Sequence, residues 1–188
     1  MKKLFLIYLL LLFLFTNKGQ NSVAVTTRVF TFNSSPLKLL QESMYVLPTY
    51  KKNYSVVQSF ANYTEKRGTH LGIDINKKGT KNCELGEPIF AITNSYVNAV
   101  NGNSKGYLST FGKLKGNIVR IVYLHCDTIL VKEGQYLRYG DMIARIGNDE
   151  GYTTAHLHLE IMSDTTKWFG GYGDVEGYID PSTLIPNY

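Results

Sequence analysis

The stretch Ala155-His-Leu-His-Leu-Glu-Ile161 alternates polar and aliphatic side chains from its second residue to its last. Successive side chains of a β-strand point to opposite faces, so residues two positions apart share a face. The alternation therefore predicts a strand with one polar and one aliphatic face. The polar face carries His156, His158 and Glu160, and the aliphatic face carries Leu157, Leu159 and Ile161.

A second stretch, His70-Leu-Gly-Ile-Asp-Ile75, shows the same period of two. His70 and Asp74 are four residues apart, which places them on one face of a predicted strand. A helix would also bring them together, but Gly72 and the β-branched isoleucines disfavour one. We expect Gly72 to leave open space for an ion between the two polar side chains.

Short apolar or alternating runs, separated by Gly, Asn, Asp and Lys, recur from Val56 onward. Parallel strands would need crossover helices, and no run of helical period lies between these segments. We therefore predict a mainly β domain, built on an antiparallel sheet with few short helices. Strands are expected at Val56–Phe60, His70–Ile75, Pro88–Ile92, Tyr96–Asn101, Asn117–Leu124, Thr128–Val131, Met142–Gly147 and His156–Met162.

The first 20 residues are typical of an export signal. Lys2 and Lys3 precede the unbroken apolar run Leu4–Phe15, which is short for a membrane span. No Ala-x-Ala cleavage site follows, so an uncleaved anchor is the alternative, and it would be the chain's one contact with a membrane. We expect residues 1–20 to be this signal, 21–55 an N-terminal extension and 56–188 the main domain, exported to the periplasm, the cell envelope or the medium.

The charge of the chain argues against nucleic acid as a partner. The formal charge is +5, and loss of residues 1–20 would remove three lysines and no acid, leaving +2. So small a charge, with no long basic block, gives no electrostatic footprint for DNA or RNA.

The two cysteines, Cys83 and Cys126, leave one question open. They lack a Cys-x-x-Cys spacing, which disfavours a cysteine zinc site. In an exported chain a disulfide between them is permitted, but the sequence does not show whether their sulfurs lie within bonding distance.

All four histidines fall in or beside predicted strands: His70, His125, His156 and His158. Placing the polar faces of the two alternating strands side by side would gather two imidazoles and one carboxylate. This is the ligand set of a catalytic zinc site, in which three protein ligands leave the fourth tetrahedral position to water. His125 ends Asn117–His125, a run apolar on both faces that predicts a central strand, and a structural role for this histidine is the alternative.

Taken in order, these motifs resemble the lysostaphin-like, or LytM-type, zinc metallopeptidases, which cut peptide bonds in bacterial peptidoglycan. The resemblance covers Val56–Pro186, more than half of the chain. It rests on the ordered pieces Ser59-Phe60, His70-x-x-x-Asp74, Gly86-Glu-Pro-Ile-Phe-Ala91, Tyr123-Leu-His125, Val131-x-x-Gly134 to Gly140-Asp-Met-Ile143, Ile146-Gly147, Ala155-His-Leu-His-Leu-Glu160 and Asp180-Pro181.

The resemblance implies a site as well as a fold. It implies one Zn²⁺ per chain, held by His70, Asp74 and His158 in an open groove of the sheet domain. It assigns His125 and His156 to proton transfer or to stabilisation of the tetrahedral oxyanion, without deciding which is the base. The implied function is an exported zinc endopeptidase that hydrolyses stem-peptide or cross-bridge bonds of peptidoglycan through a zinc-activated water.

Two other functions stay open. Some proteins with this kind of domain have lost ligands and serve as binding or activating partners of cell-wall enzymes, and the complete histidine set argues against that class. The other alternative is a zinc peptidase that acts on a protein outside the wall. The sequence does not show which peptide bond is cut.

Four features depart from the family pattern or add to it. Cys126 follows Tyr-x-His where the family commonly has a small polar residue, which points either to a redox-sensitive or disulfide-tied site or to a tolerated small side chain. Residues Tyr63–Gly68 lack the usual Gly-x-Arg, a change expected at the rim of the groove. Glu160 either orients a histidine from behind the metal or is a solvated charge. The aromatic, glycine-rich tail Lys167–Tyr178 is either a groove wall or packed filler.

Overall fold

The computed structural model describes residues 53–101, 106–148, 154–167 and 169–184, all within one compact unit, Gln41–Tyr188. The predicted signal at residues 1–20 and nearly all of the predicted extension at 21–55 lie outside these described residues. Among the described residues, no helix is long and apolar enough to cross a bilayer.

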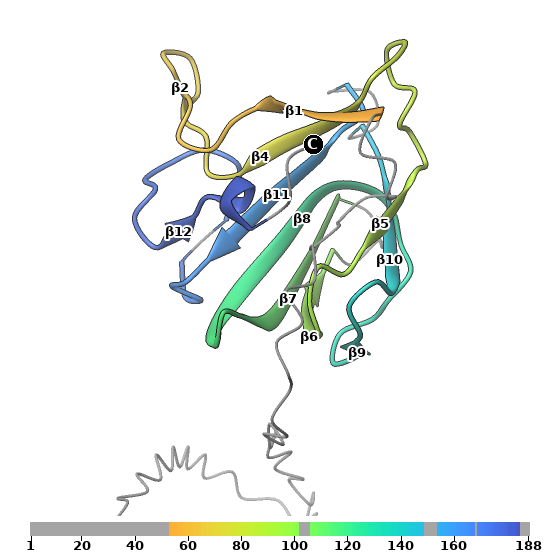
Figure 1. Ribbon diagram of the computed structural model, residues 1–188, viewed down its shortest axis with the longest axis vertical. Coiled ribbons are helices and arrows are strands. Elements are labelled where there is room, and N and C mark those ends of the chain that lie inside the picture. Colours follow the sequence, from red (N-terminus) through yellow and green to blue (C-terminus); the bar gives the residue numbers. More distant parts are fainter. Residues whose placement is uncertain (1–52, 102–105, 149–153, 168, 185–188) are drawn as a thin grey trace, which may run out of the picture. The chain divides into compact units, whose positions relative to one another are not determined.

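Strands account for almost all regular structure in the described part of the chain. They are β1 (Tyr54–Gln58), β2 (Tyr63–Thr64), β3 (Gly68–Thr69), β4 (Ile73–Lys77), β5 (Pro88–Phe90), β6 (Ser95–Val100), β7 (Gly106–Leu114), β8 (Asn117–Ile129), β9 (Tyr136–Leu137), β10 (Met142–Ile146), β11 (Leu157–Met162) and β12 (Tyr178–Ile179), followed by a 3₁₀ turn at Pro181–Thr183. Ten of them form one sheet, whose main path runs β1-β4-β11-β8-β7-β6-β9 (Figure 1). β10 pairs with β5 and β8, β12 pairs with β11, and β2 and β3 form a separate hairpin. Every pairing is antiparallel, so the predicted fold class is confirmed.

The central strand is longer than predicted. The run expected at Asn117–Leu124 and the first two residues of the run expected at Thr128–Val131 belong to one strand, β8, which ends at Ile129 and lies between β11 and β7. Its central position confirms the prediction made from its two apolar faces. The break expected between the two runs is a bulge within β8, near His125.

The strand β7 was not predicted, although it pairs with β8 along its whole length. Its buried positions include the polar residues Ser109 and Thr110 as well as Gly112, which hide the apolar pattern of an inner strand. Hydrogen bonding replaces apolar burial at one of them, because Arg120 Nε on β8 donates to Ser109 Oγ at 2.9 Å. A buried hydroxyl with such a partner fits a sheet interior at little cost.

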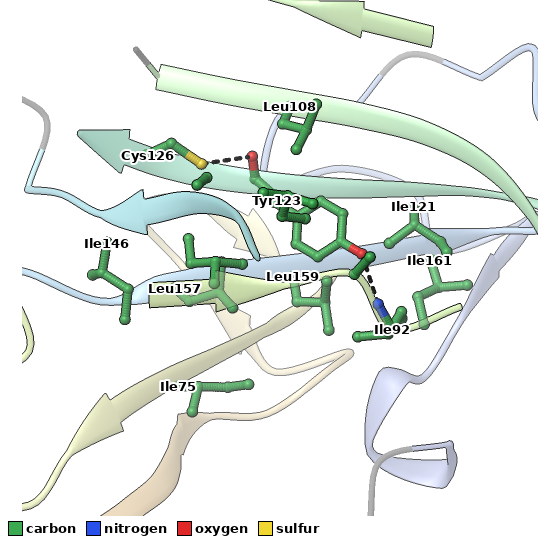
Figure 2. Close-up of a cluster of buried hydrophobic side chains, with 14 of the residues drawn as sticks. Ile75, Ile92, Leu108, Ile121, Tyr123, Cys126, Ile146, Leu157, Leu159 and Ile161 are labelled. Atoms are coloured by element: carbon green, nitrogen blue, oxygen red, sulfur yellow. Dashed lines mark hydrogen bonds between the residues drawn. The ribbon is translucent and has the colours of Figure 1, made fainter. Parts of the chain in front are cut away.

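The core lies on the aliphatic faces of β4, β8 and β11 (Figure 2). The predicted aliphatic residues of the two alternating stretches are all buried, and all except Leu71 belong to this core: Leu71, Ile73, Ile75, Leu157, Leu159 and Ile161. Burial of one such side chain stabilises the fold by about 1.5–3 kcal/mol. Tyr123 of β8 is also fully buried, and its hydroxyl accepts a hydrogen bond from the Ile92 N–H at 3.3 Å. This packing fixes the register of β4, β11 and β8, and with it the positions of the polar side chains on their other face.

Candidate metal centre

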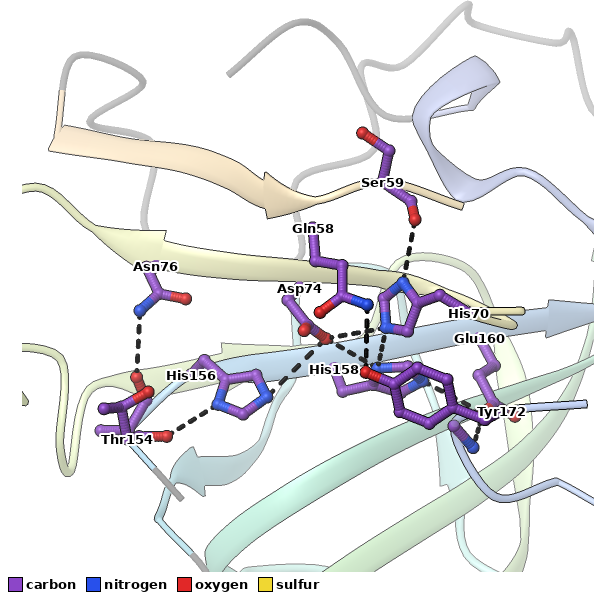
Figure 3. Close-up of polar contacts among 12 residues, drawn as sticks. Gln58, Ser59, His70, Asp74, Asn76, Thr154, His156, His158, Glu160 and Tyr172 are labelled. Carbon is purple, nitrogen blue, oxygen red and sulfur yellow. Dashed lines mark hydrogen bonds and ion pairs between the residues drawn. The ribbon is translucent and has the colours of Figure 1, made fainter. Parts of the chain in front are cut away.

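Three of the predicted site residues converge on one point at the junction of β4 and β11. The register of these strands pairs His158 with Asp74 directly. His158 Nδ1 lies 2.7 Å from Asp74 Oδ1 and 3.0 Å from His70 Nε2, and His70 Nε2 lies 3.2 Å from Asp74 Oδ1 (Figure 3). Both imidazoles are buried, and these three residues form a group that could hold a metal ion.

His70 reaches the cluster by another route than the one predicted. The strand expected at His70–Ile75 begins only at Ile73, and His70 forms an isolated antiparallel bridge with Tyr172. His70 and Asp74 therefore do not share a face of one continuous strand. They meet because the chain just before β4 is tied to the C-terminal tail, which holds the His70 ring over the end of the strand.

The expected open space at Gly72 is absent. A Cβ atom built on Gly72 would overlap the Leu159 carbonyl oxygen of β11 and stand 2.9 Å from His158 Nε2. The missing side chain thus lets two backbone segments approach closely, and it leaves no room for an ion. The interpretation of Gly72 as a gap for the metal was wrong, because the glycine serves the packing of His158 instead.

Replacing Gly72 with alanine should destabilise both the sheet and the cluster. The added methyl group would push the segment before β4 away from Leu159, and overpacking of this kind costs about 1–3 kcal/mol. Chemical denaturation of the metal-free protein would measure the loss. Gly173→Ala is the matched control, because its added methyl would meet only Leu71 Cδ1 at 3.4 Å. Equal stability of the two variants would contradict the packing role of Gly72.

The geometry of the three ligand atoms suits zinc. Zinc binds nitrogen and oxygen donors at about 2.0–2.1 Å, so neighbouring ligands of a tetrahedral site lie about 3.4 Å apart. The three separations in the cluster, 2.7, 3.0 and 3.2 Å, are slightly shorter than this edge. Two imidazole nitrogens and one carboxylate oxygen therefore meet at the vertices of a zinc polyhedron with little rearrangement.

Hydrogen bonds behind the cluster leave a lone pair on each inward nitrogen. His70 Nδ1 lies 2.9 Å from the Ser59 carbonyl oxygen, and His158 Nε2 lies 3.0 Å from Glu160 Oε1. Both oxygens only accept, so these outer nitrogens carry the hydrogens and the inner ones are left to bind a cation. Glu160 is fully buried and also accepts from the Gly171 N–H at 2.7 Å. The alternative of a solvated charge is thus wrong, and Glu160 orients a histidine.

The carboxylates favour positive charge at this point of the molecule. Burial alone would lower the pKa of His158, but its hydrogen bonds with Asp74 and Glu160 outweigh burial and raise that pKa to about 9. Burial would likewise raise the pKa of Asp74, yet hydrogen bonds with His158 and His70 hold it well below its usual range. The two carboxylates beside His158 thus favour a cation at this point.

His125 is aimed at the cluster by a bulge in β8. Across β7 the register steps from Leu124–Tyr107 to Cys126–Gly106, so β8 advances by two residues where β7 advances by one. Its φ of 62° is left-handed, and a conformation of this kind costs about 1–3 kcal/mol in a residue other than glycine. The Gly147 N–H donates to the His125 carbonyl at 2.6 Å and stabilises the bulge. Bulges of this type re-aim side chains beside functional sites.

His156 faces the cluster from the start of β11. Its Nδ1 donates to the Thr154 carbonyl at 2.7 Å, and its Nε2 lies 3.7 Å from Asp74 Oδ1. The His125 and His156 rings are 4.4 Å apart between centroids. The structure therefore brings all five predicted site residues together, three at one point and two histidines beside it.

The C-terminal tail contributes a residue that sequence reasoning missed. Tyr172 lies with its ring 5.3 Å from the His70 ring, while Phe169 is buried in a second apolar cluster. Packing is thus confirmed for Phe169, whereas Tyr172 lies beside a predicted ligand and the groove wall stays a prediction. Only the density of aromatics and glycines in Lys167–Tyr178 pointed to this segment, and that signal does not single out Tyr172.

Neither described cysteine is part of a disulfide. Cys126 is buried and lies 3.6 Å from the Tyr123 carbonyl oxygen, and Cys83 Sγ lies 3.6 Å from the Lys77 carbonyl oxygen. Weak hydrogen bonds to backbone therefore replace the disulfide that the sequence left open, and Cys126 fits as a small buried side chain.

Comparison with known proteins matches residues 68–169 to the model of peptidase family M23. Lipoprotein NlpD of Yersinia enterocolitica is 36% identical over 77 residues, which cover 40% of this chain and 77% of that protein. The catalytic domain of lysostaphin from Staphylococcus simulans superposes with a TM-score of 0.54 at 21% identity, covering 74% of this chain and 97% of that domain.

A zinc-containing peptidase from Vibrio cholerae also matches, with a TM-score of 0.48 and 24% identity over 63% of this chain. The present chain spans 36% of the length of that peptidase. The lysostaphin match shows a shared fold, whereas the family model covers more than half of the chain, including the whole ligand cluster. The chain therefore belongs to peptidase family M23, as a lysostaphin-like, LytM-type member.

Proposed function

We propose that this protein is an exported zinc endopeptidase that hydrolyses peptide bonds in peptidoglycan, within stem peptides or cross-bridges. The observation that carries the proposal is the convergence of His70 Nε2, Asp74 Oδ1 and His158 Nδ1, with each histidine oriented by an acceptor behind it. Family membership supports peptidase chemistry and a wall substrate. A module that only binds would not need the ligand set, its hydrogen-bonded supports and two further histidines at once.

The roles of the residues follow from their places around the cluster. His70, Asp74 and His158 would hold zinc, which when bound supplies Lewis acidity to a peptide carbonyl and activates water near neutral pH. His156 Nε2 faces the cluster, because its Nδ1 is engaged by Thr154. One of His125 and His156 accepts a proton from the attacking water and returns it to the leaving amine, and the other stabilises the oxyanion.

Purified peptidoglycan tests the function. The protein is incubated with walls of different cross-link chemistry, with zinc, with chelator, and with chelator followed by excess zinc, and the released fragments are identified by mass spectrometry. New amino termini should appear with zinc, vanish with chelator and return on zinc addition. Absence of chelator-sensitive ends on every wall would favour a binding or activating module. Cleavage of a glycine-rich protein but of no wall would favour a peptidase with another substrate.

A further inference from the structure

Arg67 places an exposed positive charge beside the proposed metal centre. It stands in the turn between β2 and β3, and its Nη1 donates to the Tyr172 hydroxyl at 3.4 Å. The guanidinium carbon is 5.7 Å from the centre of the Tyr172 ring, and that ring is 5.3 Å from the ring of His70. Two ring contacts thus link the cation to a proposed zinc ligand.

Tyr172, which contacts Arg67, is itself anchored on both sides. Backbone hydrogen bonds tie its two neighbours to the segment before β4, from the Leu71 N–H to the Gly171 carbonyl and from the Gly173 N–H to the Thr69 carbonyl, each at 2.9 Å. Gln58 Nε2 at the end of β1 donates to the Tyr172 hydroxyl at 3.0 Å, so the ring position is fixed from a third direction (Figure 3). The side chain that orients the guanidinium is therefore preorganised.

The guanidinium keeps most of its donors available. It has five N–H groups, and one of them is used by Tyr172. Within the described ranges of the chain, no carboxylate lies close enough to form an ion pair with it. A planar guanidinium with donors to spare matches the two oxygens of a carboxylate better than any other ligand group of a peptide.

We propose, on the basis of the proposed function, that Arg67 held by Tyr172 binds a carboxylate of the peptide substrate. The two ring contacts place the guanidinium carbon within about 11 Å of the His70 ring, so this carboxylate lies a few residues of extended peptide, at about 3.4 Å each, from the scissile bond. The preferred substrate is thus an acidic peptide. A side-chain carboxyl and a free C-terminal carboxyl offer the same chemistry, and the experiment separates them.

The test compares soluble stem-peptide fragments that are identical except that one carboxyl group at a time is converted to a carboxamide. Binding to the zinc-loaded full chain is measured by rapid-mixing fluorescence anisotropy, and cleavage is followed separately by mass spectrometry. Amidation of the recognised group should weaken wild-type binding about tenfold, the size of one charge-assisted hydrogen bond. The peptide that shows this loss tells whether the C-terminal or a side-chain carboxyl is bound.

Arg67→Gln should bind the acid and amide forms of that peptide within about twofold of each other, since the discriminating donor pair is gone. Lys66→Gln is the matched control, because it removes an exposed positive charge from the same turn. It should keep the wild-type ratio of the affinities for the acid and amide forms. Tyr172→Phe should lower the ratio by loosening the guanidinium.

A wild-type ratio in Arg67→Gln, or the same loss in Lys66→Gln, would overturn the site. An unchanged ratio in Tyr172→Phe would overturn the part played by Tyr172. If the acid-to-amide affinity ratio depends on Arg67 but the protein cleaves no peptide, the proposed hydrolysis is rejected. The carboxylate site is then still supported.

Discussion

Replacing His158 with alanine should release the metal. His158 Nδ1 is the nitrogen nearest to Asp74, at 2.7 Å, and its loss leaves two protein ligands where zinc needs three. Removal of a partner behind a ligand costs about 10–100-fold in metal affinity, so loss of the ligand itself should cost more than about 100-fold. Metal analysis after dialysis against a fixed free zinc concentration would show little zinc in the variant, and hydrolysis of peptidoglycan should fall with it.

The controls separate loss of a ligand from loss of folding. His158→Ala also deprives the buried Glu160 of its partner, and breaking a buried pair costs about 3–5 kcal/mol. The double variant His158→Ala/Glu160→Gln removes the stranded charge, so it should fold and still lack zinc. His156→Ala changes the neighbouring histidine, whose Nε2 is 3.7 Å from Asp74, and should keep its zinc. Full zinc content in His158→Ala, or equal loss in His156→Ala, would contradict the ligand assignment.

Alternation of polar and aliphatic residues predicted the parts of the fold in which one face is buried. Leu157, Leu159 and Ile161 are buried as expected, and the register that keeps this face and that of β4 on the core pairs His158 with Asp74. The strand β7 escaped prediction because Ser109 and Thr110 are buried there with hydroxyl groups that a binary pattern counts as exposed. Burial of polar groups depends on partners from other strands, which a single segment does not reveal.

The site was predictable in its composition and less so in its geometry. The five residues were found from their motifs, but Gly72 was assigned a gap because nothing local shows that β11 fills the space beside it. The contact of Tyr172 with His70 joins residues about a hundred positions apart, and no spacing rule reaches that far. The bulge at His125 likewise arises from the register between β8 and β7, and only this long-range pairing shows it.

That bulge makes His125 the site residue with the clearest expected separation between metal binding and catalysis. Its ring is 4.4 Å from that of His156 and 6.1 Å from that of His158, beside the ligand cluster but outside it. Loss of its imidazole should therefore leave the zinc content unchanged. Loss of a general acid or base, or of oxyanion stabilisation, lowers the catalytic rate by about 10²–10⁴-fold.

The backbone conformation of His125 decides which substitution can test its role in catalysis. Because its φ of 62° is left-handed, alanine would add about 1 kcal/mol of strain or more, whereas asparagine tolerates this region. His125→Asn should therefore match wild type in zinc content and thermal stability and lose kcat/KM on a soluble wall peptide by at least about 100-fold. His125→Ala should lose the same activity and some stability as well. Loss of zinc in His125→Asn would move this histidine into the ligand set, and full activity would remove it from proton transfer and leave that task to His156.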